Sequence, residues 1–183
     1  MPHVGTALID PYKIFEKISL SPGMRVADLG CGRTGHFIFP AARVVGEAGV
    51  IYAVDVMKDI LESIKSRVRS EGYDNIQTVW ADVEAVGKIP IPEKSLDVCF
   101  FVNVLFMLSK KKEALSEAAR LLKKNGFLVI VDWAKRLGAL GPVAGLEVKP
   151  MEIKGFAADL GLTLVEECVG GEYHFCLIFK KEL

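Results

Sequence analysis

Residues 26–35 read VADLGCGRTG, an apolar run that ends in a glycine-rich turn. The apolar part is typical of a buried β-strand, and the glycines allow the backbone to turn sharply and to approach a ligand closely. Gly30, Gly32 and Gly35 match the pattern GxGxxG, which doubly wound α/β folds place between the first strand and the following helix. The pattern alone is a weak signal, so the surrounding sequence must decide which ligand the turn serves.

Apolar runs recur along the chain and alternate with helical patterns. The predicted strands cover residues 24–29, 50–55, 76–80, 96–102 and 127–132. One predicted helix begins near residue 36, and others cover residues 57–69, 110–124 and 152–160. Asn125-Gly126 is a dipeptide typical of helix ends, and it sets the expected end of the helix over 110–124. This alternation predicts a doubly wound α/β fold with a mostly parallel sheet.

The C-terminal part of the chain follows a different pattern. Two strand-like runs, Leu162–Val169 and Tyr173–Lys180, are separated only by Gly170-Gly171-Glu172. So short a connection predicts an antiparallel hairpin. Most nucleotide-binding members of the doubly wound class lack such a hairpin, so it narrows the choice of fold.

Length and composition predict one domain over residues 1–183. About half of the residues are apolar (51%), which is enough for a sizeable core. Within this domain, residues 1–20 are expected to form a helical N-terminal extension and residues 134–150 a long loop, which in compact domains is often a lid. The 23 basic residues balance the 23 acidic ones, so no general attraction to nucleic acid or anionic lipid is expected.

The cysteines and the apolar segments place further limits on the protein. Cys31, Cys99, Cys168 and Cys176 lack the spacing of zinc or redox motifs, so free thiols and no metal site are expected. The start of the chain does not resemble a secretory signal. The longest apolar run, residues 98–108, is shorter than the roughly 20 residues of a membrane helix. These features predict a cytoplasmic protein without a membrane span. Phe100, Phe101, Phe106 and Met107 in the longest apolar run are expected to belong to the core, and an aromatic acceptor pocket is the alternative.

An acidic residue stands at or just after the end of each of the first three predicted strands. Asp28 precedes the first glycine, where its charge would attract a cation and repel a diphosphate. Asp55 ends the second strand about 20 residues beyond the turn, where an acid can accept both hydroxyls of a ribose. Asp82 follows the third strand and could accept a hydrogen bond from an adenine amino group. Together these residues predict a site for a nucleoside with a positively charged tail.

Four segments carry a family resemblance that extends over almost the whole chain. They read VADLGCGRTGHF at 26–37, VIYAVDVMKDIL at 50–61, TVWADVE at 78–84 and LLKKNGFLVIVDW at 121–133. In these segments the chain resembles the class I methyltransferases that depend on S-adenosylmethionine (SAM), nearest to those of ubiquinone and menaquinone biosynthesis. The resemblance implies a Rossmann-like seven-stranded sheet with a reversed last strand, SAM as cofactor and S-adenosylhomocysteine as product.

The resemblance also implies which residues contact the cofactor. The contacts with the methionine end would come from the glycine turn, at Asp28, Gly30, Cys31 and Gly32, with Gly35 completing the motif. The ribose and adenine contacts would come from Asp55, Val56, Met57, Asp82 and Val83, and Asn103 would line the floor of the site.

The implied activity is methyl transfer to a small-molecule acceptor. SAM carries its own leaving group, so no catalytic residue is predicted, and His36 and His174 are assigned no such role. Trp133 and residues 138–145 are hypothesised to close over the acceptor, with Tyr173 or His174 available for hydrogen bonding. The alternative is that Trp133 only fills the end of the sheet and that the segment is a connection without a role in binding. A nicotinamide-dependent oxidoreductase is the chief alternative, and Asp28 and the hairpin argue against it. A non-catalytic SAM-binding module and an RNA or protein methyltransferase also remain open, and the oligomeric state is not predicted.

Overall fold

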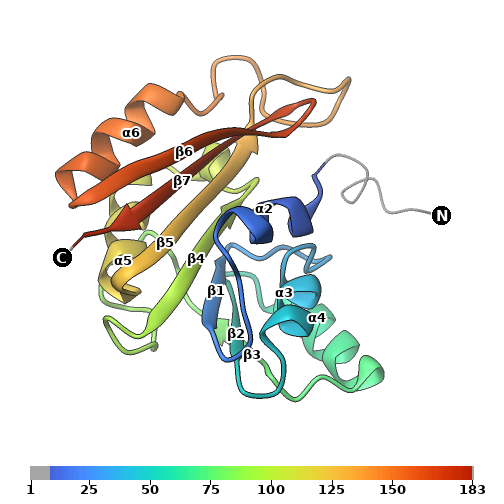
Figure 1. The fold of residues 1–183 in the computed structure, drawn as a ribbon. Helices are drawn as coiled ribbons and strands as arrows, with labels where there is room; N and C mark the ends of the chain where they lie inside the picture. Colours follow the sequence, from blue (N-terminus) through green and yellow to red (C-terminus); the bar gives the residue numbers. More distant parts are fainter. Residues whose placement is uncertain (1–8, 183) are drawn as a thin grey trace.

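The computed structural model describes residues 9–182 as helices and strands around one seven-stranded sheet (Figure 1). The elements in chain order are α2 (Pro11–Lys17), β1 (Arg25–Leu29), α3 (Ile38–Val45), β2 (Val50–Asp55), α4 (Lys58–Glu71), β3 (Ile76–Trp80), β4 (Leu96–Val102), the 3-10 turn η1 (Leu105–Met107), α5 (Lys111–Leu121), β5 (Leu122–Trp133), α6 (Pro150–Asp159), β6 (Leu162–Gly171) and β7 (His174–Lys181). The predicted extension over residues 1–20 contributes α2, while residues 1–8 lie outside the described part.

The strand order is β3-β2-β1-β4-β5-β7-β6, and β7 runs antiparallel to both of its neighbours. The predicted seven-stranded, mostly parallel sheet with an antiparallel C-terminal hairpin is therefore confirmed. The hairpin turn comprises Glu172 and Tyr173, slightly later than expected, because Gly171 still pairs with His174.

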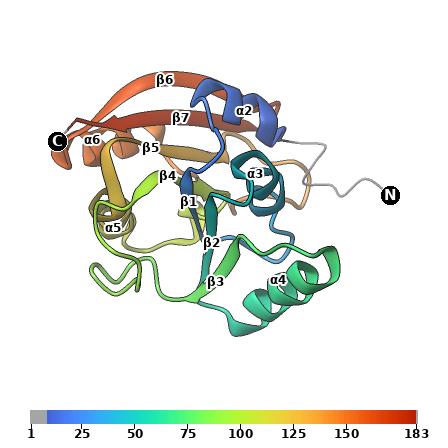
Figure 2. The same cartoon turned by 60° about the horizontal axis from the view of Figure 1, so that its bottom comes forward.

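Helices cover both faces of the sheet (Figure 2). Side chains of α2, α3 and α4 pack on one face, and those of α5 and α6 pack on the other. The central strands are buried on both faces, which explains why they read as continuous apolar runs. Within residues 9–182, no helix combines the length and apolar character that crossing a bilayer requires.

The junction of α5 and β5 differs from the prediction. Helix α5 ends at Leu121, three residues before the predicted end at 124, and β5 begins at Leu122. Asn125, with φ of +64°, and Gly126 lie inside β5. There the pairing with β4 shifts, because Leu96 faces Leu122 while Val98 faces Phe127. The Asn-Gly pair therefore forms an irregularity within a strand. Its ability to adopt positive φ values serves this irregularity instead of a helix end.

Candidate functional site

A cavity of about 670 Å³ opens at the carboxyl ends of the parallel strands. This is the edge where doubly wound sheets bind ligands. All of the residues predicted for the cofactor except Gly35 line this cavity, namely Asp28, Gly30, Cys31, Gly32, Asp55, Val56, Met57, Asp82, Val83 and Asn103. Residues more than 70 positions apart in the sequence thus meet at one site.

The glycine turn after β1 forms one wall of the cavity. The amides of Gly30 and Cys31 donate to the carbonyl oxygen of Val54, at 2.9 and 3.0 Å, which holds the turn against β2. Gly30 has φ of +79°, and a Cβ atom there would lie 2.5 Å from a methyl carbon of Val104. Only glycine therefore allows the turn to pack this closely on the segment after β4.

Gly35 completes the motif but turns away from the cavity. A Cβ atom on it would lie 2.6 Å from the ring of Phe39 and 3.0 Å from Ile64. Its role in the structure is thus to let the turn pack against α3 and α4.

Asp28 is a buried carboxylate at the base of the cavity. Its Oδ1 atom is buried and accepts no hydrogen bond from the described residues. Burial, with a smaller contribution from the charge of Asp55, raises the pKa of Asp28 to about 7. A buried carboxylate oxygen without a partner is costly, which points to a positively charged ligand group at this position.

Asp55 connects the two loops that surround the cavity. Its Oδ2 atom accepts from the amide of Gly32 at 3.2 Å, and its Oδ1 atom accepts from the amide of Met57 at 2.9 Å. Each carboxylate oxygen can accept a second hydrogen bond, so both remain available to ligand hydroxyls.

The opposite side of the cavity comes from the segments after β3 and β4. Asp82 is exposed and accepts from the amide of Glu84 at 2.8 Å, which shapes the turn containing Val83. Asn103 has φ of +54°, and its buried side-chain oxygen has no hydrogen-bond partner within residues 9–182. The cavity thus has a second unpaired polar atom, in addition to that of Asp28.

Several residues that the sequence analysis did not assign to the cofactor also line the cavity. They include Ile9, His36, Phe37, Met107, Leu108, Trp133 and Leu140. The prediction that Met107 is a core residue is wrong, because its side chain is 64% exposed at the end of the turn η1. An apolar side chain such as that of Met107 is equally suited to the core and to the wall of a cavity, and the sequence alone contains no signal that distinguishes these two positions.

Trp133 lies at the boundary between the cavity and the long loop. A Cβ atom on Gly141 would lie 3.0 Å from the Trp133 ring, and the His174 ring packs beside it at 4.3 Å between centroids. His174 is buried, and its two ring nitrogens have no hydrogen-bond partner among the described residues. Burial lowers the pKa of His174 to about 4. Tyr173 and His174 do not line the cavity, so neither is in the position expected for acceptor binding.

Comparison with known proteins shows which family has this arrangement. A family model described as a methyltransferase domain matches residues 20–154. The crystal structure of a SAM-dependent methyltransferase from Aquifex aeolicus superposes with a TM-score of 0.86 at 27% identity, over 96% of this chain and 92% of that one. The chain belongs to the class I SAM-dependent methyltransferase family.

Other relatives of this methyltransferase agree with the assignment. A ubiquinone/menaquinone biosynthesis C-methyltransferase of Azotobacter vinelandii is 32% identical over 119 residues, which are 64% of this chain and 46% of that protein. The chain spans about half the length of the curated relatives it matches. A putative type 11 methyltransferase from Sulfolobus solfataricus shares the fold, with a TM-score of 0.75 at 23% identity over 96% of this chain and 94% of that one.

Membership of the family implies SAM as the methyl donor. The residues of the cavity fit this cofactor. The unpaired oxygen of Asp28 suits a cationic group, and Asp55 offers acceptors for hydroxyls on the neighbouring loop. The charge of Asp28 at the glycine turn would repel a diphosphate there, which counts against a nicotinamide dinucleotide, whereas Asp55 fits the ribose of either cofactor.

Proposed function

We propose that this methyltransferase transfers the methyl group of SAM to a small-molecule acceptor by direct in-line displacement. The observation that carries the proposal is the unpaired, buried Asp28 oxygen in a cavity that also presents Asp55. The names of the curated relatives support a small acceptor, because ubiquinone and menaquinone are small molecules. We further propose a single domain in the cytoplasm, as the sequence predicts.

In this proposal each side chain has a binding or orienting task. Asp28 holds the amino group of the cofactor, Asp55 accepts from the ribose hydroxyls, and Asp82 and Val83 contact the adenine. SAM supplies the reactive methyl group and its own leaving group, so the chain mainly aligns the two reactants and excludes water. Met107, Leu108 and Trp133 present apolar surface in the remaining part of the cavity, which favours an acceptor with an apolar face.

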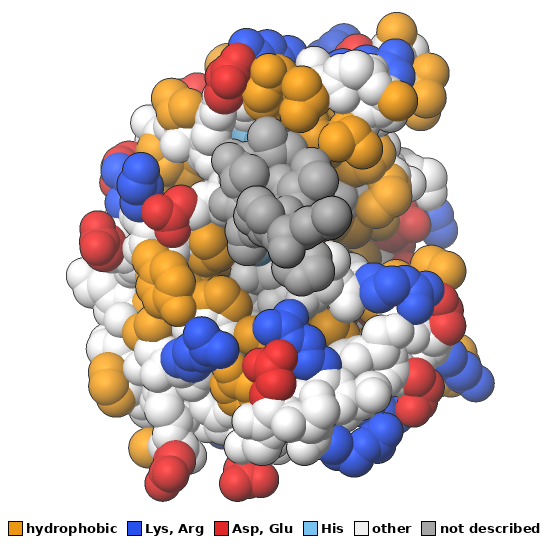
Figure 3. All heavy atoms as spheres, turned by 90° about the vertical axis from the view of Figure 1, so that its right-hand side faces the viewer, with side chains coloured by type: hydrophobic (Ala, Val, Ile, Leu, Met, Phe, Trp, Pro, Cys, Tyr) orange, Lys and Arg blue, Asp and Glu red, His pale blue; other side chains and the backbone are white. Residues whose placement is uncertain are grey.

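A macromolecular acceptor receives less support. Acidic and basic side chains are interspersed on the part of the face in Figure 3 that grey atoms leave uncovered, so this part offers no continuous basic surface for a phosphate backbone. The zero formal net charge agrees with this reading.

Methyl transfer can be tested with methyl-labelled SAM and a cell extract. We expect the protein to bind SAM and to place the label in a small molecule. A panel of purified acceptors would then identify the methylated atom. Tight binding of NAD instead of SAM would contradict the cofactor, label found in RNA or protein would contradict the acceptor class, and SAM binding without turnover would indicate a non-catalytic module.

SAM affinity is expected to fall as the pH drops below about 7. Burial raises the pKa of Asp28 to about 7, so this carboxylate is ionised above that pH and becomes neutral below it. Because the cationic ligand needs the ionised form, the affinity should fall by up to about tenfold for each pH unit below the pKa. Calorimetry from about pH 5.5 to 8.5 measures this slope.

The matched control for the pH experiment is Asp28→Asn, which keeps the shape of the side chain but cannot ionise. Its weaker SAM affinity should vary little over the same range. An unchanged slope in this variant would assign the titration to another group, such as Asp132, whose pKa burial raises to about 6.

Shortening the segment over residues 138–145 is expected to slow methyl transfer and to leave most of the SAM affinity. Leu140 lines the cavity and Gly141 packs against Trp133, so this segment is proposed to close over the acceptor. Loss of acceptor alignment acts on the reacting geometry and not on cofactor binding. Parallel measurements of the SAM dissociation constant and the single-turnover rate test this, with Val143→Ser as an exposed control in the same loop. Equal loss of both quantities, or of neither, would contradict the lid.

A further inference from the structure

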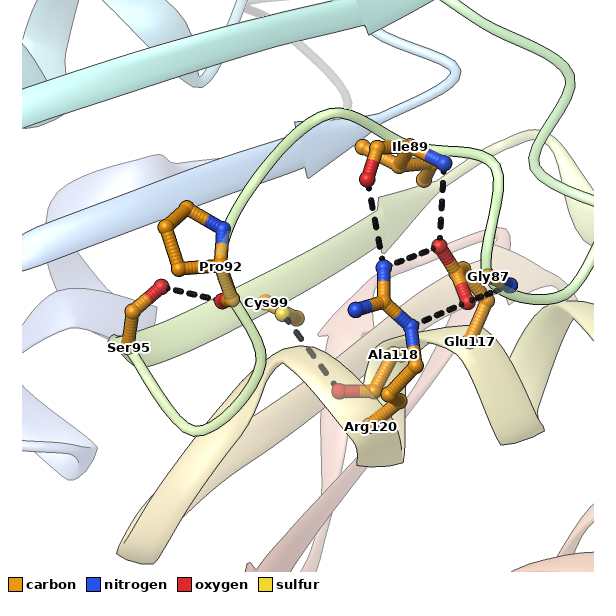
Figure 4. Close-up of polar contacts among 8 residues, drawn as sticks. All are labelled: Gly87, Ile89, Pro92, Ser95, Cys99, Glu117, Ala118 and Arg120. Atoms are coloured by element: carbon orange, nitrogen blue, oxygen red, sulfur yellow. Dashed lines mark hydrogen bonds and ion pairs between the residues drawn. The ribbon is translucent and has the colours of Figure 1, made fainter.

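Helix α5 carries a buried acidic residue that holds a loop rather than a ligand (Figure 4). The carboxylate of Glu117 accepts from the amide of Gly87 at 2.6 Å and from the amide of Ile89 at 3.2 Å. Its side chain is fully buried, and it does not line the cavity. The loop it holds connects β3 to β4, and near its start it contains Asp82, Val83 and Glu84, which do line the cavity.

Arg120 lies one helical turn further along α5 and completes the network. It donates to both carboxylate oxygens of Glu117, at 2.8 and 2.7 Å, and to the carbonyl oxygen of Ile89 at 3.2 Å. Burial by itself would raise the pKa of Glu117, but the hydrogen bonds from Arg120, Gly87 and Ile89 outweigh it and the pKa lies below its usual value. Glu117 is therefore ionised in the folded protein, with its charge paired.

A second contact holds the near end of the same loop. Glu84 accepts from the hydroxyl of Ser109 at 3.1 Å and from the amide of Lys110, which stands at the start of α5. The loop is thus attached to both ends of one helix. Met107 and Leu108, just before this helix, line the cavity on another side. Helix α5 therefore connects two walls of the cavity through a single rigid element.

We propose that Glu117 and Arg120 are positioning residues that fix the wall formed by Asp82, Val83 and Glu84, and so set the width of the cavity where the adenine binds. This inference rests on the proposed function. A buried ion pair contributes little net stability compared with an apolar pair of the same size. The hydrogen bonds that the amides of Gly87 and Ile89 donate to Glu117 instead define one position for the loop, which a purely apolar contact would leave less defined.

The first test compares Glu117, which holds the loop between β3 and β4, with Asp97, whose hydrogen bonds go to Arg25 and Lys123 instead. Glu117→Gln is expected to raise the dissociation constant for SAM roughly tenfold, the size of coupling typical within one hydrogen-bond network. The rate at saturating SAM should change by less than about twofold, because the reacting atoms are not displaced. Arg120→Lys keeps the charge but loses the paired geometry, so its effect should be intermediate.

The matched control is Asp97→Asn. Asp97 accepts from the amide of Arg25 at 2.8 Å and pairs with Lys123 at 2.9 Å, near the amino ends of the strands. Both variants should lower the melting temperature, but Asp97→Asn should leave the SAM dissociation constant unchanged. If Glu117→Gln and Asp97→Asn changed the SAM affinity equally, Glu117 would contribute only to overall stability, and the inference would be overturned.

A second measurement uses the unmodified protein and does not depend on any variant folding. If Glu117 and Arg120 are coupled to the cavity wall, SAM should slow hydrogen exchange at the amides of Gly87 and Ile89, although neither residue lines the cavity. The amide of Arg25 should be unaffected. SAM binding without protection at Gly87 and Ile89 would overturn the inference alone, whereas no SAM binding at all would overturn the proposed function with it.

Discussion

Replacement of Asp55 by alanine is expected to weaken SAM binding by roughly 2–3 kcal/mol, or about 30- to 150-fold. The variant loses charge-assisted hydrogen bonds to the ribose hydroxyls. It also loses the contacts to the amides of Gly32 and Met57, at 3.2 and 2.9 Å, that join the two loops of the site. Isothermal titration calorimetry measures the change directly.

The control for this experiment is Asp59→Ala. Asp59 lies on α4 and pairs with Arg33 of the glycine turn, but both side chains are more than half exposed. An exposed ion pair contributes less than about 1 kcal/mol, so this variant should bind SAM almost normally. Unchanged SAM affinity in a folded Asp55→Ala protein would remove Asp55 from the site.

Replacement of Gly30 by alanine is expected to lower the free energy of unfolding by about 2–4 kcal/mol. An L-residue at φ of +79° is strained, and the new Cβ atom would lie 2.5 Å from a methyl carbon of Val104. Val104 is buried and has little room to move. Urea unfolding monitored by circular dichroism provides the measurement.

Gly32→Ala is the matched control for the packing contribution. Gly32 has φ of +63°, but no atom lies within 4 Å of an added Cβ. The free energy of unfolding of this variant should therefore fall only by the cost of the added backbone strain, about 1–2 kcal/mol. Similar losses in the two variants would mean that contact with Val104 is not what requires glycine at position 30.

Much of the fold could be predicted because its signals are local. Apolar runs bounded by turn residues indicated the strands, and the short connection around Gly171 indicated the hairpin. The three strand-end acids, Asp28, Asp55 and Asp82, were predicted at one site because parallel strands place their carboxyl ends on a common edge. Position along a strand is a property of the sequence, so these residues could be located without coordinates.

The tertiary structure decided what depends on pairing and burial. Asn125-Gly126 has the sequence of a helix end, yet it lies within β5 because the register with β4 shifts there. Gly35 belongs to the glycine motif, yet packing against Phe39 turns it from the cavity.

The hydrogen-bond partners of the buried polar groups also depend on the tertiary structure. Local pattern indicates which residues are polar or flexible. The hydrogen bond between Glu117 and Gly87, 30 residues away, arises only when distant segments pack together. The same packing leaves Oδ1 of Asp28 buried without a partner in the described part of the chain. The sequence by itself thus determined the family, the order of the elements and ten of the residues lining the cavity. Only the packing of the folded chain determined which of its buried charges are paired within the protein and which are left to meet a ligand.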